Sequence, residues 1–173
     1  MIPTWLPPWL SGDLSLISGF LTWIVVLYWL WRSGWKIQRR YFIEATQKPL
    51  TRNAIVWSAG IVGAIFFVAA QMRPGMPGVM TVAMIGALSA YVDARTHRLP
   101  NAYTVAMAIG VVLGLAVGGV ISPLWQERLF GALIGALIWF VPIALLNRLP
   151  GGMGGGDVKL GPVLGALVGS VGL

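Results

Sequence analysis

Apolar residues occur along this chain in six long runs, separated by short segments that are polar or rich in glycine and proline. The runs are Leu14–Trp31, Ala54–Met72, Val79–Val92, Asn101–Ile121, Leu129–Leu146 and Val158–Leu173. Most approach the roughly 20 residues that an α-helix needs to cross the hydrocarbon of a bilayer. The third run is short, and we expect its helix to begin near Pro77 and to continue past Asp93. The pattern predicts an all-α fold, a polytopic transmembrane helix bundle of about six spans.

The composition favours a membrane protein over a soluble one. Apolar residues make up 57% of the chain and charged residues 10%, and the mean hydropathy is +0.81. A soluble domain carries about 25% charged residues, because its surface must be solvated. Six spans would fill nearly all of the 173 residues. We therefore predict a single membrane domain, 1–173, whose N-terminal part, 1–78, holds two spans and a basic cytoplasmic loop.

The basic residues are divided unequally between the two faces of the predicted bundle. Ten of the twelve Lys and Arg residues fall on one face, whereas Arg73 and Arg128 fall on the other. Short loops rich in Lys and Arg stay in the cytoplasm, so the ten-residue face is predicted to be cytoplasmic and both termini to lie outside. This bias explains the net charge of +7 without a nucleic-acid partner. We expect a multi-pass protein of the cell inner (plasma) membrane, in contact with membrane lipid.

Few side chains are available to bind a metal ion. The chain has no cysteine and a single histidine, His97. Disulfides, cysteine-ligated zinc and sites built from several histidines are therefore excluded. We expect no metal site and no cofactor.

Glycines recur at four-residue spacing in two of the apolar runs. In a membrane such a stripe either lets two helices approach closely or reflects only the general abundance of glycine in spans. The stripes are Gly110, Gly114 and Gly118 in the fourth run and Gly161, Gly165 and Gly169 in the sixth.

Two of the five acidic residues directly adjoin apolar runs at their cytoplasmic ends. Asp93 follows the third run and Asp157 precedes the sixth, and ionisable groups at such places are candidates for a functional role. Asp157 could instead be the N-cap of the sixth helix. Asp93 lies at a helix C-terminus, where a negative charge opposes the helix dipole. A site role and a salt bridge to Arg95 or Arg98 are the interpretations that remain for Asp93.

Two carboxyl groups at one depth can divide the work of hydrolysis between them. Like-charge repulsion lets a close pair share a single proton. The ionised member then takes a proton from water, while the protonated member polarises a carbonyl group, as in aspartic proteases. From the helix dipoles we expect Asp157 to act as the base and Asp93 as the acid.

The segments around these aspartates resemble two motifs of the type IV prepilin peptidases. Residues 93–101, Asp-Ala-Arg-Thr-His-Arg-Leu-Pro-Asn, are similar to the first motif, an aspartate followed by polar residues and an Ile/Leu-Pro-Asn turn. Residues 154–160, Gly-Gly-Gly-Asp-Val-Lys-Leu, are similar to the second, Gly-x-Gly-Asp followed by a Val-Lys-Leu type sequence. The resemblance extends over a peptidase-like part, 79–173, with both motifs in the family's order.

The resemblance implies an activity, a site and a substrate. Asp93 and Asp157 would be the catalytic pair of a GxGD-type membrane aspartic endopeptidase. Such enzymes remove the short basic leader of prepilin-like, single-span proteins, cutting after a glycine on the cytoplasmic side. Gly154, Gly155 and Gly156 would form a substrate-binding tract, because a glycine backbone can approach an extended peptide closely.

The chain departs from the family pattern at both ends. It has no cysteine, so it lacks the cysteine-rich loop of the bifunctional members, and we expect no methyltransferase activity. The family usually places further spans after the Gly-x-Gly-Asp helix, whereas this sequence stops at Leu173. We expect either a truncated sequence or a relative shortened at the C-terminus.

These departures keep other functions open. An aspartate pair needs surrounding helices to hold both side chains near one water molecule. The chain could therefore be a catalytically inactive, peptidase-like helical subunit that acts as a scaffold in a larger membrane complex. A transporter with a proton or cation site is a third possibility, although it would place the acids nearer the middle of the membrane.

Overall fold

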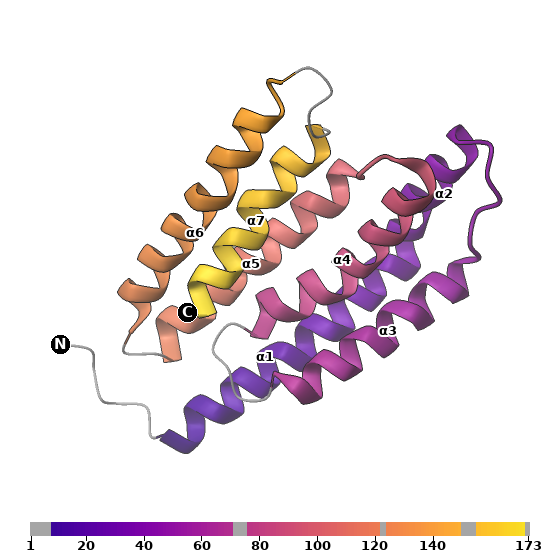
Figure 1. The fold of residues 1–173 in the computed structure, drawn as a ribbon. Coiled ribbons are helices and arrows are strands. Elements are labelled where there is room, and N and C mark those ends of the chain that lie inside the picture. Colours follow the sequence, from indigo (N-terminus) through magenta and orange to yellow (C-terminus); the bar gives the residue numbers. More distant parts are fainter. Residues whose placement is uncertain (1–7, 71–75, 122–123, 150–154, 172–173) are drawn as a thin grey trace.

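In the computed structural model, residues 8–70, 76–121, 124–149 and 155–171 are described, and the account below concerns these residues. Within them the chain forms helices and connections and contains no strand, which confirms the predicted all-α bundle (Figure 1). The elements are α1 (Pro8–Trp29), the π-helix η1 (Leu30–Gly34), α2 (Trp35–Glu44), α3 (Arg52–Ala69), α4 (Met76–Thr96), α5 (Asn101–Ile121), α6 (Trp125–Leu146) and α7 (Gly155–Val171).

The segment between the first two apolar runs, Arg32–Asn53, was expected to be a basic cytoplasmic loop, but its first part is helical. The α1 helix continues through η1 into α2 and ends only at Glu44. Apolar residues lie among the basic ones in α2, and Phe42, 2% exposed, stacks on Tyr91 of α4 with ring centroids 5.7 Å apart. The loop prediction was wrong up to Glu44, because these apolar side chains give the charged segment a face to bury.

Helix α4 lies at the centre of the bundle, and α6 lies at its periphery (Figure 1). Within their most apolar windows, 56% of the α4 residues are buried, compared with 6% of the α6 residues. The α4 residues in the hydrophobic core are Met80, Met84, Ile85, Leu88 and Val92. Helix α4 begins at Met76, one residue before Pro77, and ends at Thr96, beyond Asp93. This confirms the bounds expected for the helix of the third run.

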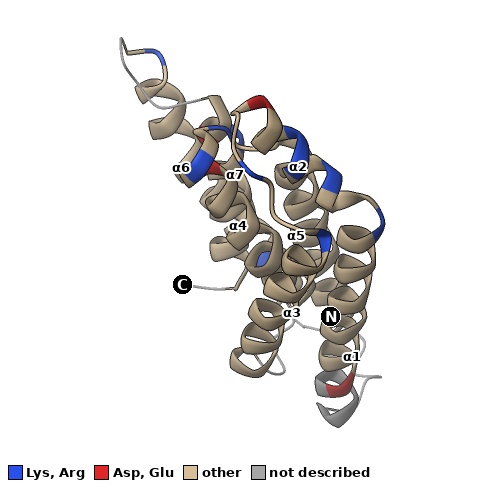
Figure 2. Cartoon of the chain, turned by 90° about the vertical axis from the view of Figure 1, so that its right-hand side faces the viewer, with Lys and Arg blue, Asp and Glu red and all other residues tan. Residues whose placement is uncertain are grey.

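The helices have the dimensions of membrane spans. Five helices in the described part of the chain are long and apolar enough to cross a membrane, the first of them including α2. The sixth predicted run corresponds to α7, which has 17 residues and a length of roughly 26 Å at 1.5 Å per residue. The chain is therefore a multi-pass membrane protein. Figure 2 shows Lys and Arg residues gathered toward the end of the bundle where α2 lies.

Both predicted glycine stripes lie at helix contacts. The α5 glycines Gly110, Gly114 and Gly118 are buried, and a Cβ on Gly110 would clash with Thr81 of α4. In α7, a Cβ on Gly165 or Gly169 would clash with the backbone of α6 at Gly135 or Gly131, respectively. Close approach of two helix backbones through small residues is a common way to join membrane helices. The α6–α7 hairpin is held together in this way.

Candidate functional site

Asp93 lies in the last turn of α4, where the chain reverses direction. The backbone N–H of His97 donates to the Asp93 carbonyl oxygen at 2.8 Å. His97 then adopts a φ of 50°, in the left-handed region that ends many helices. Two residues beyond Arg98, the carbonyl oxygen of Pro100 accepts hydrogen bonds from the first turn of α5. The connection after Asp93 is therefore short, and it places His97 at the bend where α4 ends.

Asp157 lies in the first turn of α7, two residues after the helix begins at Gly155. It is therefore inside the helix rather than its N-cap, and the N-cap interpretation is wrong. Just before it, a Cβ on Gly156 would lie 2.7 Å from the Cβ of Leu99. At that separation, a side chain at position 156 would force one of the two segments to shift. Gly156 thus allows the start of α7 to approach the α4–α5 connection that follows Asp93.

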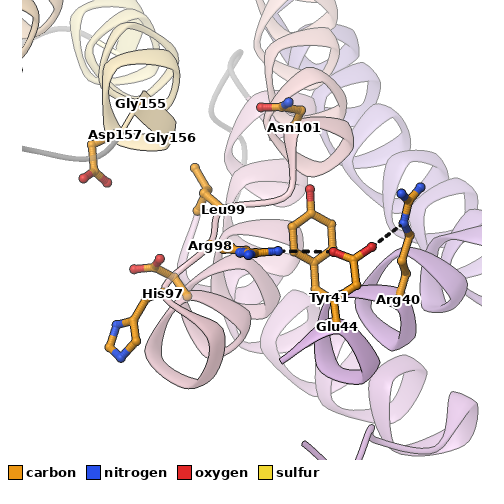
Figure 3. Close-up of a pocket in the computed structure, with 11 residues that line it drawn as sticks. Arg40, Tyr41, Glu44, His97, Arg98, Leu99, Asn101, Gly155, Gly156 and Asp157 are labelled. Carbon is orange, nitrogen blue, oxygen red and sulfur yellow. Dashed lines mark hydrogen bonds and ion pairs between the residues drawn. The ribbon is translucent and has the colours of Figure 1, made fainter. Parts of the chain in front are cut away.

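The structure brings both aspartates to one cavity of about 590 Å³. Asp93 is exposed and Asp157 is half-buried. Figure 3 shows Asp157 on one side of the cavity and the α2 residues on the other, with Leu99 between them. The cavity is lined by Arg40, Tyr41, Glu44, Asp93, His97, Arg98, Leu99, Asn101, Gly155, Gly156 and Asp157.

The glycines predicted to bind substrate also lie here, as far as they are described. Gly155 and Gly156 line the cavity, and a Cβ on Gly155 would meet nothing within 4 Å. Gly154 lies outside the described residues. Of these two described glycines, Gly156 alone makes a close contact that favours glycine at its position.

The cations of the cavity pair with Glu44 rather than with the aspartates. Glu44 accepts from Arg40 at 2.8 Å and from Arg98 at 3.3 Å, and dashed lines mark both pairs in Figure 3. Arg95 instead lies over the ring of Tyr91, 5.9 Å from its centroid. In the described part of the chain, neither arginine forms the salt bridge to Asp93 considered above. Arg98, in the connection that follows Asp93, is thus engaged by Glu44 of α2.

Two further hydrogen bonds join the segments that form the cavity. The Lys159 ammonium group on α7 donates to the side-chain oxygen of Asn101 at the start of α5, at 3.1 Å. The amide of Gln47, in the α2–α3 connection, donates to the carbonyl oxygen of Arg95 at 2.6 Å. Gln47 thereby satisfies one of the carbonyl groups left free at the end of α4.

Sequence reasoning did not identify the wall contributed by α2. Arg40, Tyr41 and Glu44 come from a segment expected to be a loop, and Asn101 was noted only as the first residue of the fourth run and the last residue of the first motif. The signal that could have found Glu44 is that it is the single acid among six basic residues between Arg32 and Arg52. Within the described ranges, no three His, Cys, Asp or Glu side chains gather as a metal site would require.

Comparison with known families singles out the C-terminal half of the chain. The sequence pattern that defines the type IV leader peptidase family matches residues 79–173, which is just over half of the chain. The matched segment contains Asp93, Asp157 and all of α4 to α7 except the first three residues of α4. No curated protein and no solved structure matches the chain.

Proposed function

Because the chain belongs to the type IV leader peptidase family, we propose that it is an aspartic endopeptidase that removes the leader of prepilin-like membrane proteins. The observation that carries this proposal is that Asp93 and Asp157, from separate helices, line the same cavity. In this proposal 79–173 is the peptidase-like part, and 1–78 supplies two spans and the α2 wall.

The proposed reaction uses one carboxylate, one carboxylic acid and one water molecule. The carboxylate takes a proton from water as the water oxygen attacks the carbonyl carbon of the scissile peptide bond. The carboxylic acid donates its proton to the carbonyl oxygen, which gives a neutral tetrahedral intermediate. When the C–N bond breaks, a proton passes to the leaving nitrogen, and an acid and an amine are released. General acid–base catalysis of this kind contributes about 10²–10⁴-fold to a rate.

The helix ends suggest which aspartate takes which part. Asp157 lies in the first turn of α7, where backbone N–H groups favour a negative charge. Asp93 lies in the last turn of α4, where carbonyl groups oppose one. We assign the base to Asp157 and the acid to Asp93, and the two exchange roles when the intermediate collapses.

The distribution of basic residues supports a cytoplasmic site. Arg95, Arg98 and Lys159 border the two aspartates and belong to the face that carries ten of the twelve Lys and Arg residues. By the positive-inside rule this is the cytoplasmic face of the inner membrane. Water is available there for hydrolysis, while the apolar helices can hold the single-span segment of the substrate in the bilayer. The glycine tract before Asp157 would contact the extended peptide.

Cleavage by purified variants tests the proposal. The full chain in lipid vesicles is incubated with a prepilin-like substrate and compared with Asp93→Asn and Asp157→Asn. We expect each substitution to lower the cleavage rate by at least about 10²-fold. Glu127→Gln is the matched control, because Glu127 is an exposed acid at the start of α6, away from the cavity.

The same experiment separates the peptidase from the scaffold. If the parent chain cleaves nothing, while it and both aspartate variants assemble equally well into a larger membrane complex, the scaffold is the better description. Cleavage that persists in both aspartate variants would also contradict the proposed mechanism.

A further inference from the structure

One hydrogen bond directly joins the two segments that resemble the family motifs. Its acceptor, the Asn101 side-chain oxygen, closes the connection that begins after Asp93. Its donor, the Lys159 ammonium group, lies two residues beyond Asp157 on α7. The donor is charged, the bond is 3.1 Å long, and both side chains are exposed. The two motif segments are thus linked by their own polar side chains.

The remaining contacts of α7 are directed mainly at α6 rather than at the helix that carries Asp93. Gly165 and Gly169 pack on the α6 backbone, and a Cβ on Gly161 would lie 2.5 Å from the Ile143 side chain. These contacts fix α7 against α6. They do not determine where the Asp157 end of α7 lies relative to Asp93. Toward Asp93, the Asn101–Lys159 hydrogen bond accompanies the approach of Gly156 to Leu99. Leu160, next to Lys159, packs against the apolar core around α4 but makes no directional contact with the segment that follows Asp93.

We propose that the Asn101–Lys159 hydrogen bond is a clasp that sets the position of Asp157 relative to Asp93. The inference rests on the proposed function, since it assigns both residues as positioning residues for that reaction. Neither residue needs to touch the scissile bond. A displacement of about 1 Å in a catalytic group can cost roughly 10²-fold in rate, so one exposed hydrogen bond can matter more for turnover than for folding.

The clasp predicts a particular pattern in kinetic experiments. Asn101→Ala and Lys159→Met should each lower kcat by about 10–10²-fold, with a much smaller change in KM. Because both substitutions break the same contact, the double variant should be no slower than the slower single variant. The exchanged pair, Asn101→Lys with Lys159→Asn, restores a donor opposite an acceptor and should recover most of the rate.

Several results would overturn the clasp. Additive losses in the double variant, or no recovery in the exchanged pair, would mean that the residues act separately. A loss that appears in KM alone would instead indicate that Lys159 binds substrate or a lipid headgroup. The control is Lys36→Ala, which removes an exposed lysine of α2 outside the cavity and should leave the kinetics unchanged.

A crosslinking experiment tests the same inference without any enzymatic activity. The chain has no cysteine, so Leu99→Cys with Gly156→Cys introduces the only thiol pair. Their Cβ positions lie 2.7 Å apart, and a small outward shift brings them to the spacing of about 3.8 Å found in disulfides. We expect this pair to form a disulfide under mild oxidation in vesicles.

Loss of the clasp should slow that crosslink. Adding Lys159→Met to the cysteine pair should reduce the rate of disulfide formation by about two- to tenfold, the change expected from losing one hydrogen bond. An unchanged rate would overturn the clasp, and failure of the parent pair to crosslink would overturn the close approach of the two segments. Neither readout needs a substrate, so the clasp can fail or hold independently of the proposed peptidase activity.

Discussion

The hydroxyl group of Tyr103 donates a hydrogen bond of 3.1 Å to the carbonyl oxygen of Gly34. Tyr103 is fully buried in α5, and Gly34 is the last residue of η1, where the helix widens so that Trp35 N–H bonds to Leu30. Because η1 precedes α2, this bond ties the helix carrying Glu44 to the helix that begins at Asn101. It joins the N-terminal part of the chain to the family-matched part.

Removing this hydroxyl group should destabilise the bundle modestly. We expect Tyr103→Phe to lower the free energy of unfolding by about 0.5–1.5 kcal/mol, the usual value of one buried hydrogen bond. Denaturation in detergent, followed by circular dichroism, would measure the change. The control is Tyr28→Phe, since Tyr28 is 61% exposed and should have no comparable effect. Equal stability of the two variants would contradict a structural role for the Tyr103 hydroxyl group.

The contact between Gly156 and Leu99 predicts a sharp difference between neighbouring glycines. Gly156→Ala puts a methyl group 2.7 Å from Leu99, so α7 must shift, and we expect cleavage to fall by about 10–10²-fold. Gly155→Ala meets nothing within 4 Å and should have a much smaller effect. Leu99→Ala should rescue Gly156→Ala, because it makes room for the added methyl group. Equal losses at Gly155 and Gly156 in the cleavage assay would argue against this contact.

Side chains added at the glycines of the α6–α7 interface should destabilise the bundle. Gly135→Ala and Gly165→Ala each place a methyl group against the facing backbone. Overpacking of this kind costs about 1–3 kcal/mol. Gly119→Ala in α5 is the control, because nothing lies within 4 Å of its Cβ position. A thermal unfolding scan should show lower transition temperatures for the first two variants only.

Glu44 should matter more for activity than for stability. Its pairs with Arg40 and Arg98 are exposed, so Glu44→Gln should change the unfolding temperature little. The substitution frees Arg98 from its ion pair with Glu44, inside the cavity that Asp93 also lines. We expect Arg98 then to pair with the Asp93 carboxylate and to slow cleavage several-fold.

The double variant Glu44→Gln/Arg98→Gln removes the competing cation and should recover the lost rate in the same assay. If the double variant is as slow as Glu44→Gln, the arginine is not the cause, and Glu44 acts in another way.

The six apolar helices, α1 and α3 to α7, and their approximate ends could be predicted from the sequence, because long apolar runs have few alternatives to a membrane helix. The fourth run, 101–121, coincides with α5. The α2 helix could not be predicted in this way, since Arg32 to Glu44 is polar on average. Its helical state depends on Phe42 and its neighbours packing against α4.

The sequence by itself determined that the chain is a helical membrane protein, and it singled out Asp93 and Asp157. Composition and motif order are local properties that can be read along a chain. Only the tertiary structure decided what surrounds the two aspartates: the wall from α2, the pairing of Arg98 with Glu44, and the hydrogen bond between Asn101 and Lys159. These contacts join residues up to 58 positions apart. They depend on how closely the helices pack. A glycine such as Gly156 allows close packing, but its presence in the sequence does not show which helix it will pack against.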